Sequence, residues 1–248
     1  MLEVKNLKKR FGGFEAVKGI SFSVKKGEVL GFLGPNGAGK STTMRMITGF
    51  LPPSEGTAAI CGFDIRENPV EAKRHLGYLP ESAPSYRAMT VREFLLFAAH
   101  MRDFSGAAAK EAVERAIERA RLAPVAGKTI ETLSKGYRQR TCFAQAIIHD
   151  PAVLVMDEPT DGLDPNQKFA VREMIKEMSA EKAIVISTHI LEEVDAVCTR
   201  AIVISGGEVK ADATPAALKA QAADGRLETV FRKLTCAGTE EKGKGATA

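Results

Sequence analysis

The stretch Gly34-Pro35-Asn36-Gly37-Ala38-Gly39-Lys40-Ser41 decides the fold of this chain, because it fits the phosphate-binding pattern G-x-x-x-x-G-K-[ST]. Its glycines let successive backbone N–H groups converge on phosphate oxygens, and the helix that it opens adds positive potential at its N-terminus. In this pattern the lysine bridges the β- and γ-phosphates and the serine hydroxyl binds Mg²⁺. We therefore expect the chain to bind ATP through Gly34, Pro35, Asn36, Gly37, Ala38, Gly39, Lys40, Ser41 and Thr42.

The sequence around this loop predicts an α/β fold. Apolar runs at residues 29–33, 153–156, 184–186 and 202–204 leave no polar face, which is typical of parallel strands covered by helices on both sides. Residues 20–24 alternate between apolar and polar side chains and predict an antiparallel strand with one face in solvent. Because an apolar run precedes the glycine-rich loop and a helix follows it, a turn formed by chance is the weaker explanation of the loop.

Helix-forming residues dominate the middle of the chain, from Thr90 to about Asp150. Thr90 and Glu93 form a capping box that opens one helix, and residues 111–121 predict another. We therefore expect a mainly helical insert between two parts of the α/β core. Residues 237–248 have no apolar pattern and predict a disordered tail.

Two acidic residues, Asp157 and Glu158, directly follow the apolar run 153–156. An Asp at the tip of such a strand, beside a phosphate-binding loop, holds Mg²⁺ directly or through water. Glu158 can act as the general base that polarises the water attacking the γ-phosphate. The alternative is a solvated acidic pair, which the phosphate-binding loop disfavours. The two motifs together predict a nucleoside triphosphatase.

The bulk composition is that of an ordinary globular protein. The 248 residues carry a formal net charge of +4 without a long run of one sign, which argues little for nucleic-acid binding. Cys61, Cys142, Cys198 and Cys236 lie far apart, so we expect reduced, mostly buried thiols of a cytosolic protein. The N-terminus lacks a signal-peptide pattern, and the apolar runs are shorter than the ~20 residues that cross a bilayer.

Three further motifs point to a family. The segment Leu-Ser-Lys-Gly-Tyr-Arg-Gln-Arg at residues 133–140 resembles the LSGGQ signature of ABC ATPases. Residues 161–164, Asp-Gly-Leu-Asp, resemble its D-loop, and residues 187–189, Ser-Thr-His, its switch histidine. The glycine-rich loop at residues 34–41 and the pair Asp157 and Glu158 correspond to the Walker A and B motifs. All five motifs follow one another in the family's order over roughly residues 1–235. The chain is thus similar to ATP-binding subunits of ABC transporters, of the export-type subgroup with separate permeases.

The resemblance implies the domain organisation. A P-loop NTPase core of the RecA-like type, with a mainly parallel sheet and an antiparallel N-terminal β-subdomain, would comprise about residues 1–80 and 151–235. A helical subdomain would occupy about residues 81–150, and residues 236–248 would form the tail.

The resemblance also implies that two chains share each nucleotide. Head-to-tail packing would present the signature helix of one chain to the γ-phosphate that the other holds, so that ATP joins the subunits and hydrolysis separates them. We expect a homodimer. Ser134 can serve as an ordinary N-cap as well, since the two roles are compatible. The residues expected to reach the partner's nucleotide are Ser134, Lys135, Gly136, Tyr137 and Asp164.

Two residues are assigned to the nucleotide by family position. Phe11 falls where relatives place an aromatic ring that stacks on adenine, with Val17 packed nearby; the alternative is a half-buried edge-strand Phe. His189 would hydrogen-bond the γ-phosphate and position Glu158 and the attacking water, and the alternative is a structural histidine. Lys40, Glu158 and His189 are therefore the expected catalytic residues.

Glu81 stands where the family's Q-loop carries Gln, after the apolar segment 76–80. A carboxylate adds a negative charge close to the triphosphate and can bind the metal more strongly than an amide. We expect Ser41, Asp157 and Glu81 to hold Mg²⁺, against the alternative of a solvated side chain at position 81.

The expected function is therefore ATP hydrolysis that drives integral membrane permease subunits, at the cytoplasmic side of the membrane as a peripheral protein. A soluble ABC ATPase acting on nucleic acid, a ribosome or a cofactor-assembly scaffold is the alternative, and we expect no nucleic-acid partner. A small-molecule P-loop kinase would leave residues 133–139 unexplained. The cargo is not determined by this chain, because the permease contacts it in this family.

Overall fold

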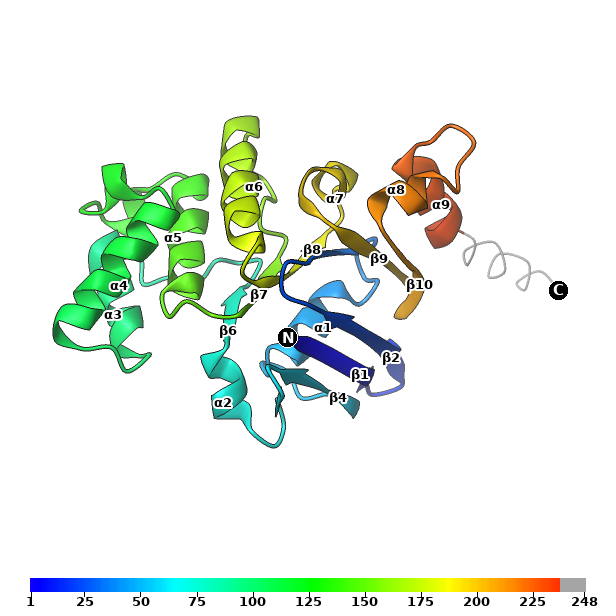
Figure 1. Cartoon of the computed structure of the whole chain (residues 1–248), viewed down its shortest axis with the longest axis horizontal. Coiled ribbons are helices and arrows are strands. Elements are labelled where there is room, and N and C mark those ends of the chain that lie inside the picture. The colour runs from blue at the N-terminus through cyan, green and yellow to red at the C-terminus, as the bar shows by residue number, and fades with distance from the viewer. Residues whose placement is uncertain (237–248) are drawn as a thin grey trace.

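A six-stranded sheet of order β10-β9-β3-β8-β7-β6 forms the centre of the fold in the computed structural model, which describes residues 1–236 (Figure 1). The pairs β3–β8, β3–β9, β7–β8 and β6–β7 are parallel, and β10 pairs with β9 in antiparallel fashion. The strands are β3 (Val29–Leu33), β6 (Leu76–Leu79), β7 (Val153–Asp157), β8 (Ala183–Thr188), β9 (Arg200–Ser205) and β10 (Glu208–Ala213).

The inner strands of this sheet are apolar on both faces because both faces are covered. Every residue of β3, β7 and β8 is buried. Helix α1 (Lys40–Ile47) lies against one face, and α6 (Pro165–Ser179) packs on the other with Val171, Met174 and Ile175. The predicted parallel sheet with helices on both sides is confirmed.

A second, antiparallel sheet of order β2-β1-β4-β5 packs on the far side of α1. In β2, Ile20, Phe22 and Val24 are buried while Ser21 and Ser23 are exposed, as the alternation predicts. Met44 and Ile47 of α1 belong to a core shared by both sheets. The strands are β1 (Leu2–Phe11), β2 (Phe14–Val24), β4 (Glu55–Ile60) and β5 (Phe63–Asp64).

The helices between β6 and β7 lie together on one side of the sheets (Figure 1). The Thr90–Glu93 capping box is present at the start of its helix. The helix predicted at residues 111–121 begins earlier and ends earlier, because Ser105 lies at its N-cap, Ala107 to Ala109 extend it, and Arg121 has a left-handed backbone (φ 54°). These elements are α3 (Val91–His100), α4 (Gly106–Arg119), η1 (Ala123–Val125), η2 (Ile130–Thr132) and α5 (Lys135–Ile147).

These helical elements all fall within the predicted insert of residues 81–150. The subdomain boundaries themselves stay a prediction. The other helices are α2 (Pro69–Arg74), α7 (Leu191–Val197), α8 (Pro215–Lys219) and α9 (Leu227–Cys236), of which α8 and α9 pack on β9 and β10 through a small separate core.

Residues 237–248 of the predicted tail lie outside the described residues, and Cys236 belongs to α9. The expectation of mostly buried thiols is wrong, because only Cys142 is fully buried while Cys61 and Cys198 are half-buried and Cys236 is exposed. Among residues 1–236, no helix is both long and apolar enough to span a bilayer.

Candidate nucleotide-binding site

A cavity of about 480 Å³ lies where the glycine-rich loop, the β1–β2 hairpin and the ends of β7 and β8 meet. The sheet order brings together segments that are far apart in the sequence, since β3 and β7 flank β8 and all three are parallel. The cavity is lined by Phe11, Phe14, Ala16, Asn36, Gly37, Gly39, Lys40, Ser41, Thr42, Glu81, Glu158, Asp161 and His189.

The loop adopts a conformation that only glycine accommodates easily at position 39. Gly39 has φ 102° and lies at the N-cap of α1. A Cβ atom there would stand 2.6 Å from the carbonyl oxygen of Ala16 and 3.3 Å from Cγ2 of Val17. Val17 is completely buried and packs against the loop. Ala16, and not Val17, lines the cavity.

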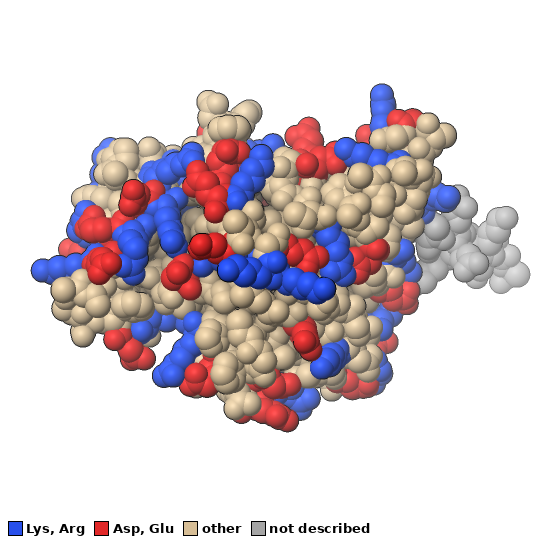
Figure 2. Space-filling view, viewed as in Figure 1, with Lys and Arg blue, Asp and Glu red and all other residues tan. Residues whose placement is uncertain are grey.

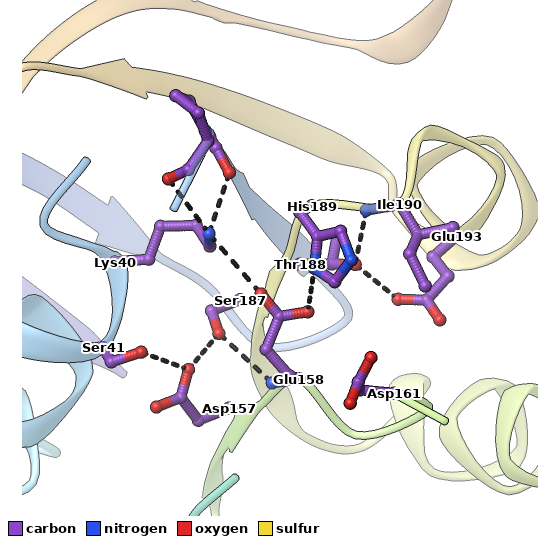
Figure 3. Close-up of polar contacts among 12 residues, drawn as sticks. Lys40, Ser41, Asp157, Glu158, Asp161, Ser187, Thr188, His189, Ile190 and Glu193 are labelled. Atoms are coloured by element: carbon purple, nitrogen blue, oxygen red, sulfur yellow. Dashed lines mark hydrogen bonds and ion pairs between the residues drawn. The ribbon is translucent and has the colours of Figure 1, made fainter. Parts of the chain in front are cut away.

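Lys40 is almost fully enclosed at the start of α1, with 6% of its surface exposed. Its Nζ donates hydrogen bonds to the carbonyl oxygens of Gly34 (2.8 Å) and Pro35 (3.3 Å). The same atom lies 3.5 Å from Oε1 of Glu158, across the cavity (Figure 3). The ammonium group is thus held at the point where the loop would receive phosphates.

Asp157 combines with Ser41 in an arrangement that suits Mg²⁺. Its Oδ1 accepts hydrogen bonds from the hydroxyls of Ser41 (3.2 Å) and Ser187 (Figure 3). Its Oδ2 is buried and has no hydrogen-bond partner among the described residues. A carboxylate with an unused oxygen beside a hydroxyl provides the hard oxygen donors that Mg²⁺ prefers.

The protein donors at this position are few. Residues 1–236 contain no cluster of three or more His, Cys, Asp or Glu side chains that could hold a metal by themselves. A metal beside Asp157 would therefore take its other ligands from phosphate and water oxygens, as Mg²⁺ does in phosphoryl-transfer sites.

Burial and the negative charge of Asp157 raise the pKa of the nearby Tyr78 hydroxyl to about 12, so this phenol stays protonated.

Glu158 is held tightly between Lys40 and His189. Its Oε2 lies 2.9 Å from Nδ1 of His189, and its backbone N–H donates to the carbonyl oxygen of Ser187 at 3.1 Å. Its backbone has φ 50°, a left-handed conformation that costs a non-glycine residue about 1–3 kcal/mol. This backbone turns the carboxylate of a residue just after β7 into the cavity, beside the lysine and the histidine.

Two aromatic rings form the outer wall of the cavity. Phe11 and Phe14 face each other across the β1–β2 hairpin and are 49% and 64% exposed. Lys9 places its Nζ 5.2 Å from the centre of the Phe11 ring. Phe11 is therefore a half-exposed ring in the cavity wall, and its stacking on adenine stays a prediction. Phe14 was missed in the sequence, although its place opposite Phe11 in the hairpin would have indicated it.

The signature segment does not line this cavity in the part of the chain described. Ser134 caps α5, accepting a hydrogen bond from the Tyr137 N–H at 3.4 Å, which confirms its structural role. Gly136 is buried, and a Cβ there would stand 2.2 Å from Oε1 of Gln167 on α6. Asp164 caps α6 by accepting from the Gln167 N–H at 3.0 Å.

One ion pair joins the signature segment to the cavity. Lys135 lies with its Nζ 3.7 Å from Oδ2 of Asp161, and both side chains are half-exposed. Asp161 also lines the nucleotide cavity. The sequence did not indicate Asp161 as a site residue, because only the fold brings the start of α5 beside the loop after β7.

The glycine-rich loop follows β3, and a buried Asp-Glu pair lies at the end of β7, which is separated from β3 in the sheet by β8 alone. This arrangement defines a P-loop NTPase domain. The chain belongs to the ABC transporter family, whose domain matches residues 17–161.

Proteins similar in sequence and in structure agree with this membership. The probable multidrug ABC transporter ATP-binding protein YbhF of Escherichia coli is 37% identical over 241 residues, which are 94% of this chain and 41% of YbhF. The Nod factor export ATP-binding protein I of Burkholderia orbicola is 39% identical over 88% of this chain and 72% of its own length. A solved structure of an ATP-binding subunit of an ABC transporter superposes with a TM-score of 0.84 at 30% identity, covering 94% of this chain and 99% of that one. The chain thus spans less than half the length of YbhF.

Proposed function

We propose that this chain binds and hydrolyses ATP to energise transport by separate membrane permease subunits. The observation that carries the proposal is the convergence of Lys40, Glu158 and His189 on one cavity beside Asp157. Family membership supports the same function, and the wall formed by Phe11 and Phe14 offers ring faces on which adenine can stack.

The geometry suggests a role for each group in hydrolysis. Lys40 would bind β- and γ-phosphate oxygens, and Ser41 and Asp157 would hold Mg²⁺, which neutralises phosphate charge when bound. Glu158 would accept a proton from the attacking water, while the hydrogen bond from His189 fixes the orientation of its carboxylate. Glu81 reaches the same cavity from the segment after β6, and we propose that it contacts the metal.

The signature segment supports a head-to-tail dimer. Ser134 and Lys135 are exposed at the N-terminus of α5 but lie outside the wall of the chain's own cavity, in the region described. A second chain would bring its triphosphate to this helix terminus, which favours anions. The Lys135–Asp161 pair then connects the surface offered to the partner with the chain's own nucleotide site.

A groove lined in part by β6 suits the binding of a permease subunit. Two adjoining cavities of about 820 and 620 Å³ share Tyr78, Met101 and Arg102 as lining residues. Phe50, which is 76% exposed, lines one of them, and Met101 is 67% exposed. Exposed apolar side chains around a groove between core and helical insert suit a short helix of a membrane subunit. This placement would put the chain at the cytoplasmic side of the membrane as a peripheral protein.

The proposed direction of transport is based on the names of the relatives alone. Their names describe multidrug transport and Nod factor export, so we propose export as the direction for this chain. On the face shown in Figure 2, acidic and basic side chains intermingle without a continuous basic region, which gives no support to a nucleic-acid partner.

The proposal is tested by isolating the complex. A tagged Glu158→Gln variant, in which hydrolysis is slowed, would be captured from detergent-extracted membranes with ATP and Mg²⁺. We expect a multi-span membrane protein in stoichiometric amount, and its loss when Phe50→Asp is added to the same chain. A ribosomal or scaffold protein in its place, or a soluble dimer alone, would reject the transporter function.

A further inference from the structure

Glu193 is a buried acid that none of the roles above uses. It lies on α7, 2% of its surface is exposed, and its Oε2 accepts a hydrogen bond from the Thr188 hydroxyl at 2.6 Å. Its Oε1 is buried without a hydrogen-bond partner among the residues described. Burial of a carboxylate costs stability unless hydrogen bonds or opposite charges compensate for it, so the contacts of Glu193 show what holds it in this place.

The Thr188 hydroxyl that Glu193 holds is also the acceptor for a backbone group. The Ile190 N–H donates to Thr188 Oγ1 at 3.0 Å, so the residues on both sides of His189 are joined through one oxygen atom. Figure 3 shows Glu193 beyond this turn, with one carboxylate oxygen directed at Thr188 and the imidazole of His189 directed at Glu158. Glu193 therefore holds the turn that carries His189 through its hydrogen bond with Thr188.

Positive charges on the neighbouring helix face this acid. Burial, together with the negative charge of Glu158, keeps the pKa of Glu193 above its usual value, although the Thr188 hydrogen bond and the charges of Arg172 and Lys168 on α6 act to lower it. Nε and Nη2 of Arg172 are themselves buried without a hydrogen-bond partner within residues 1–236. Helix α6 begins at Pro165, directly after its N-cap Asp164, so the positive charges near Glu193 come from the helix that follows residues 161–164.

We propose that Glu193 is a positioning residue for hydrolysis, which holds Thr188 and thereby keeps the His189 imidazole in hydrogen-bonding distance of the Glu158 carboxylate. The inference rests on the proposed role of His189. The Thr188 hydroxyl donates a hydrogen bond to Glu193, so a neutral amide oxygen at position 193 can replace the carboxylate as acceptor. This predicts a clear difference between two substitutions at one position.

The first experiment compares Glu193→Ala with Glu193→Gln in steady-state ATP hydrolysis by the full chain. We expect kcat to fall by about 100-fold for Glu193→Ala, because a side chain displaced by about 1 Å loses that much, and to stay within a few-fold for Glu193→Gln. KM should change little in both. Glu192→Ala, at the exposed neighbouring position on α7, is the matched control. Equal loss in the Ala and Gln variants, or no loss in either, would overturn the inference.

The second experiment asks whether Glu193 acts through His189. In the double variant with His189→Ala, loss of Glu193 should cause no further decrease in the residual rate, whereas a general structural role would decrease it again. If Glu193→Ala fails to fold, Thr188→Val takes its place, which removes the hydrogen bond to Glu193 and also the one from the Ile190 N–H, with Thr188→Ser as control.

A spectroscopic readout separates this inference from the proposed role of His189. The chain has four histidines, and ¹⁵N signals of the His189 imidazole can be assigned with His189→Ala. They should shift in Glu193→Ala but not in Glu193→Gln, while those of His75 and His100 stay in place; unchanged His189 signals would reject the positioning role. Normal turnover in His189→Ala would reject the role of His189 and with it this inference. Normal turnover in Glu193→Ala, with His189→Ala impaired, would reject this inference alone.

Discussion

The Nζ atom of Lys40 lies 3.5 Å from Oε1 of Glu158, so the lysine of the phosphate-binding loop and the acid after β7 form an ion pair with both side chains more than nine-tenths buried. The two charges compensate each other in a place where either alone would be costly. A triphosphate that binds Lys40 would compete with Glu158 for the same ammonium group. The pair therefore links the state of the phosphate site to the position of the proposed general base.

Glu158→Gln should separate binding from hydrolysis. The amide keeps the shape of the side chain but cannot accept the proton of the attacking water, so we expect kcat to fall about 10²- to 10⁴-fold. ATP affinity should stay equal or rise, because Lys40 loses a competing negative charge. Phosphate release and binding of a fluorescent ATP analogue measure the two quantities, and Glu181→Gln at an exposed position is the control. Parallel loss of binding and turnover would contradict the general-base role.

Glu81→Gln should change the dependence of hydrolysis on Mg²⁺. If the Glu81 carboxylate contacts the metal, its replacement by an amide weakens that contact, and half-maximal activity should need more Mg²⁺. The measurement is ATPase activity in a Mg²⁺ titration at fixed ATP, with the exposed Glu67→Gln as control. An identical titration curve would reject a metal contact for Glu81.

Gly39→Ala should destabilise the loop more than Gly37→Ala. Both residues have a positive φ, and an alanine there costs about 1–2 kcal/mol. Only at position 39 does a Cβ meet backbone, at 2.6 Å from the Ala16 oxygen, and overpacking adds about 1–3 kcal/mol. Urea unfolding gives both free energies. Equal values for the two variants would show that the loop relaxes around the added methyl group.

Phe14→Ala should weaken ATP binding, although sequence motifs did not indicate this residue. Stacking on a base contributes about 1–3 kcal/mol, so a contact with adenine would appear as a loss of affinity of about fivefold or more. The ring is 64% exposed, so the free energy of unfolding should change little. Binding of a fluorescent ATP analogue measures the effect, beside Phe11→Ala and, as control, Phe50→Ala in the groove. Unchanged affinity in Phe14→Ala would exclude it from the base site.

Acidification should destabilise the fold through His149. Burial, together with the charge of Arg102, lowers the pKa of its imidazole to about 4, although the Leu76 carbonyl oxygen lies 3.0 Å from Nε2. The folded state therefore prefers the neutral ring, and below the ordinary pKa of about 6.5 the unfolded chain binds the additional proton. The contribution of His149 is fully present above that pH and is lost between about pH 6.5 and 4.

The measurement is urea unfolding of wild type and His149→Gln across that range of pH. The glutamine amide can still donate to Leu76 but does not titrate, so the difference between the two proteins should change by a few kcal/mol on acidification. A difference independent of pH would show that His149 is protonated as easily in the folded state as in the unfolded chain.

The sequence by itself determined the parts of the site that are read locally. The glycine-rich loop, the Asp157–Glu158 pair and the capping box at Thr90 each depend on a few consecutive residues, whose backbone N–H groups and φ angles follow from residue type. The buried strands were predictable for the same reason, since an apolar run without a polar face has to be covered on both sides.

Tertiary structure alone decided which of these residues meet. Packing between segments far apart in the chain decides three such features. Ala16 and not Val17 reaches the cavity, Glu193 is buried against Thr188, and Cys61 and Cys198 are only half-buried. Such contacts carry no local signature, because a carboxylate or a thiol has the same sequence neighbours whether it faces solvent or the core. The pairing of Lys40 with Glu158 exists only because the parallel sheet brings the ends of β3 and β7 to the same edge.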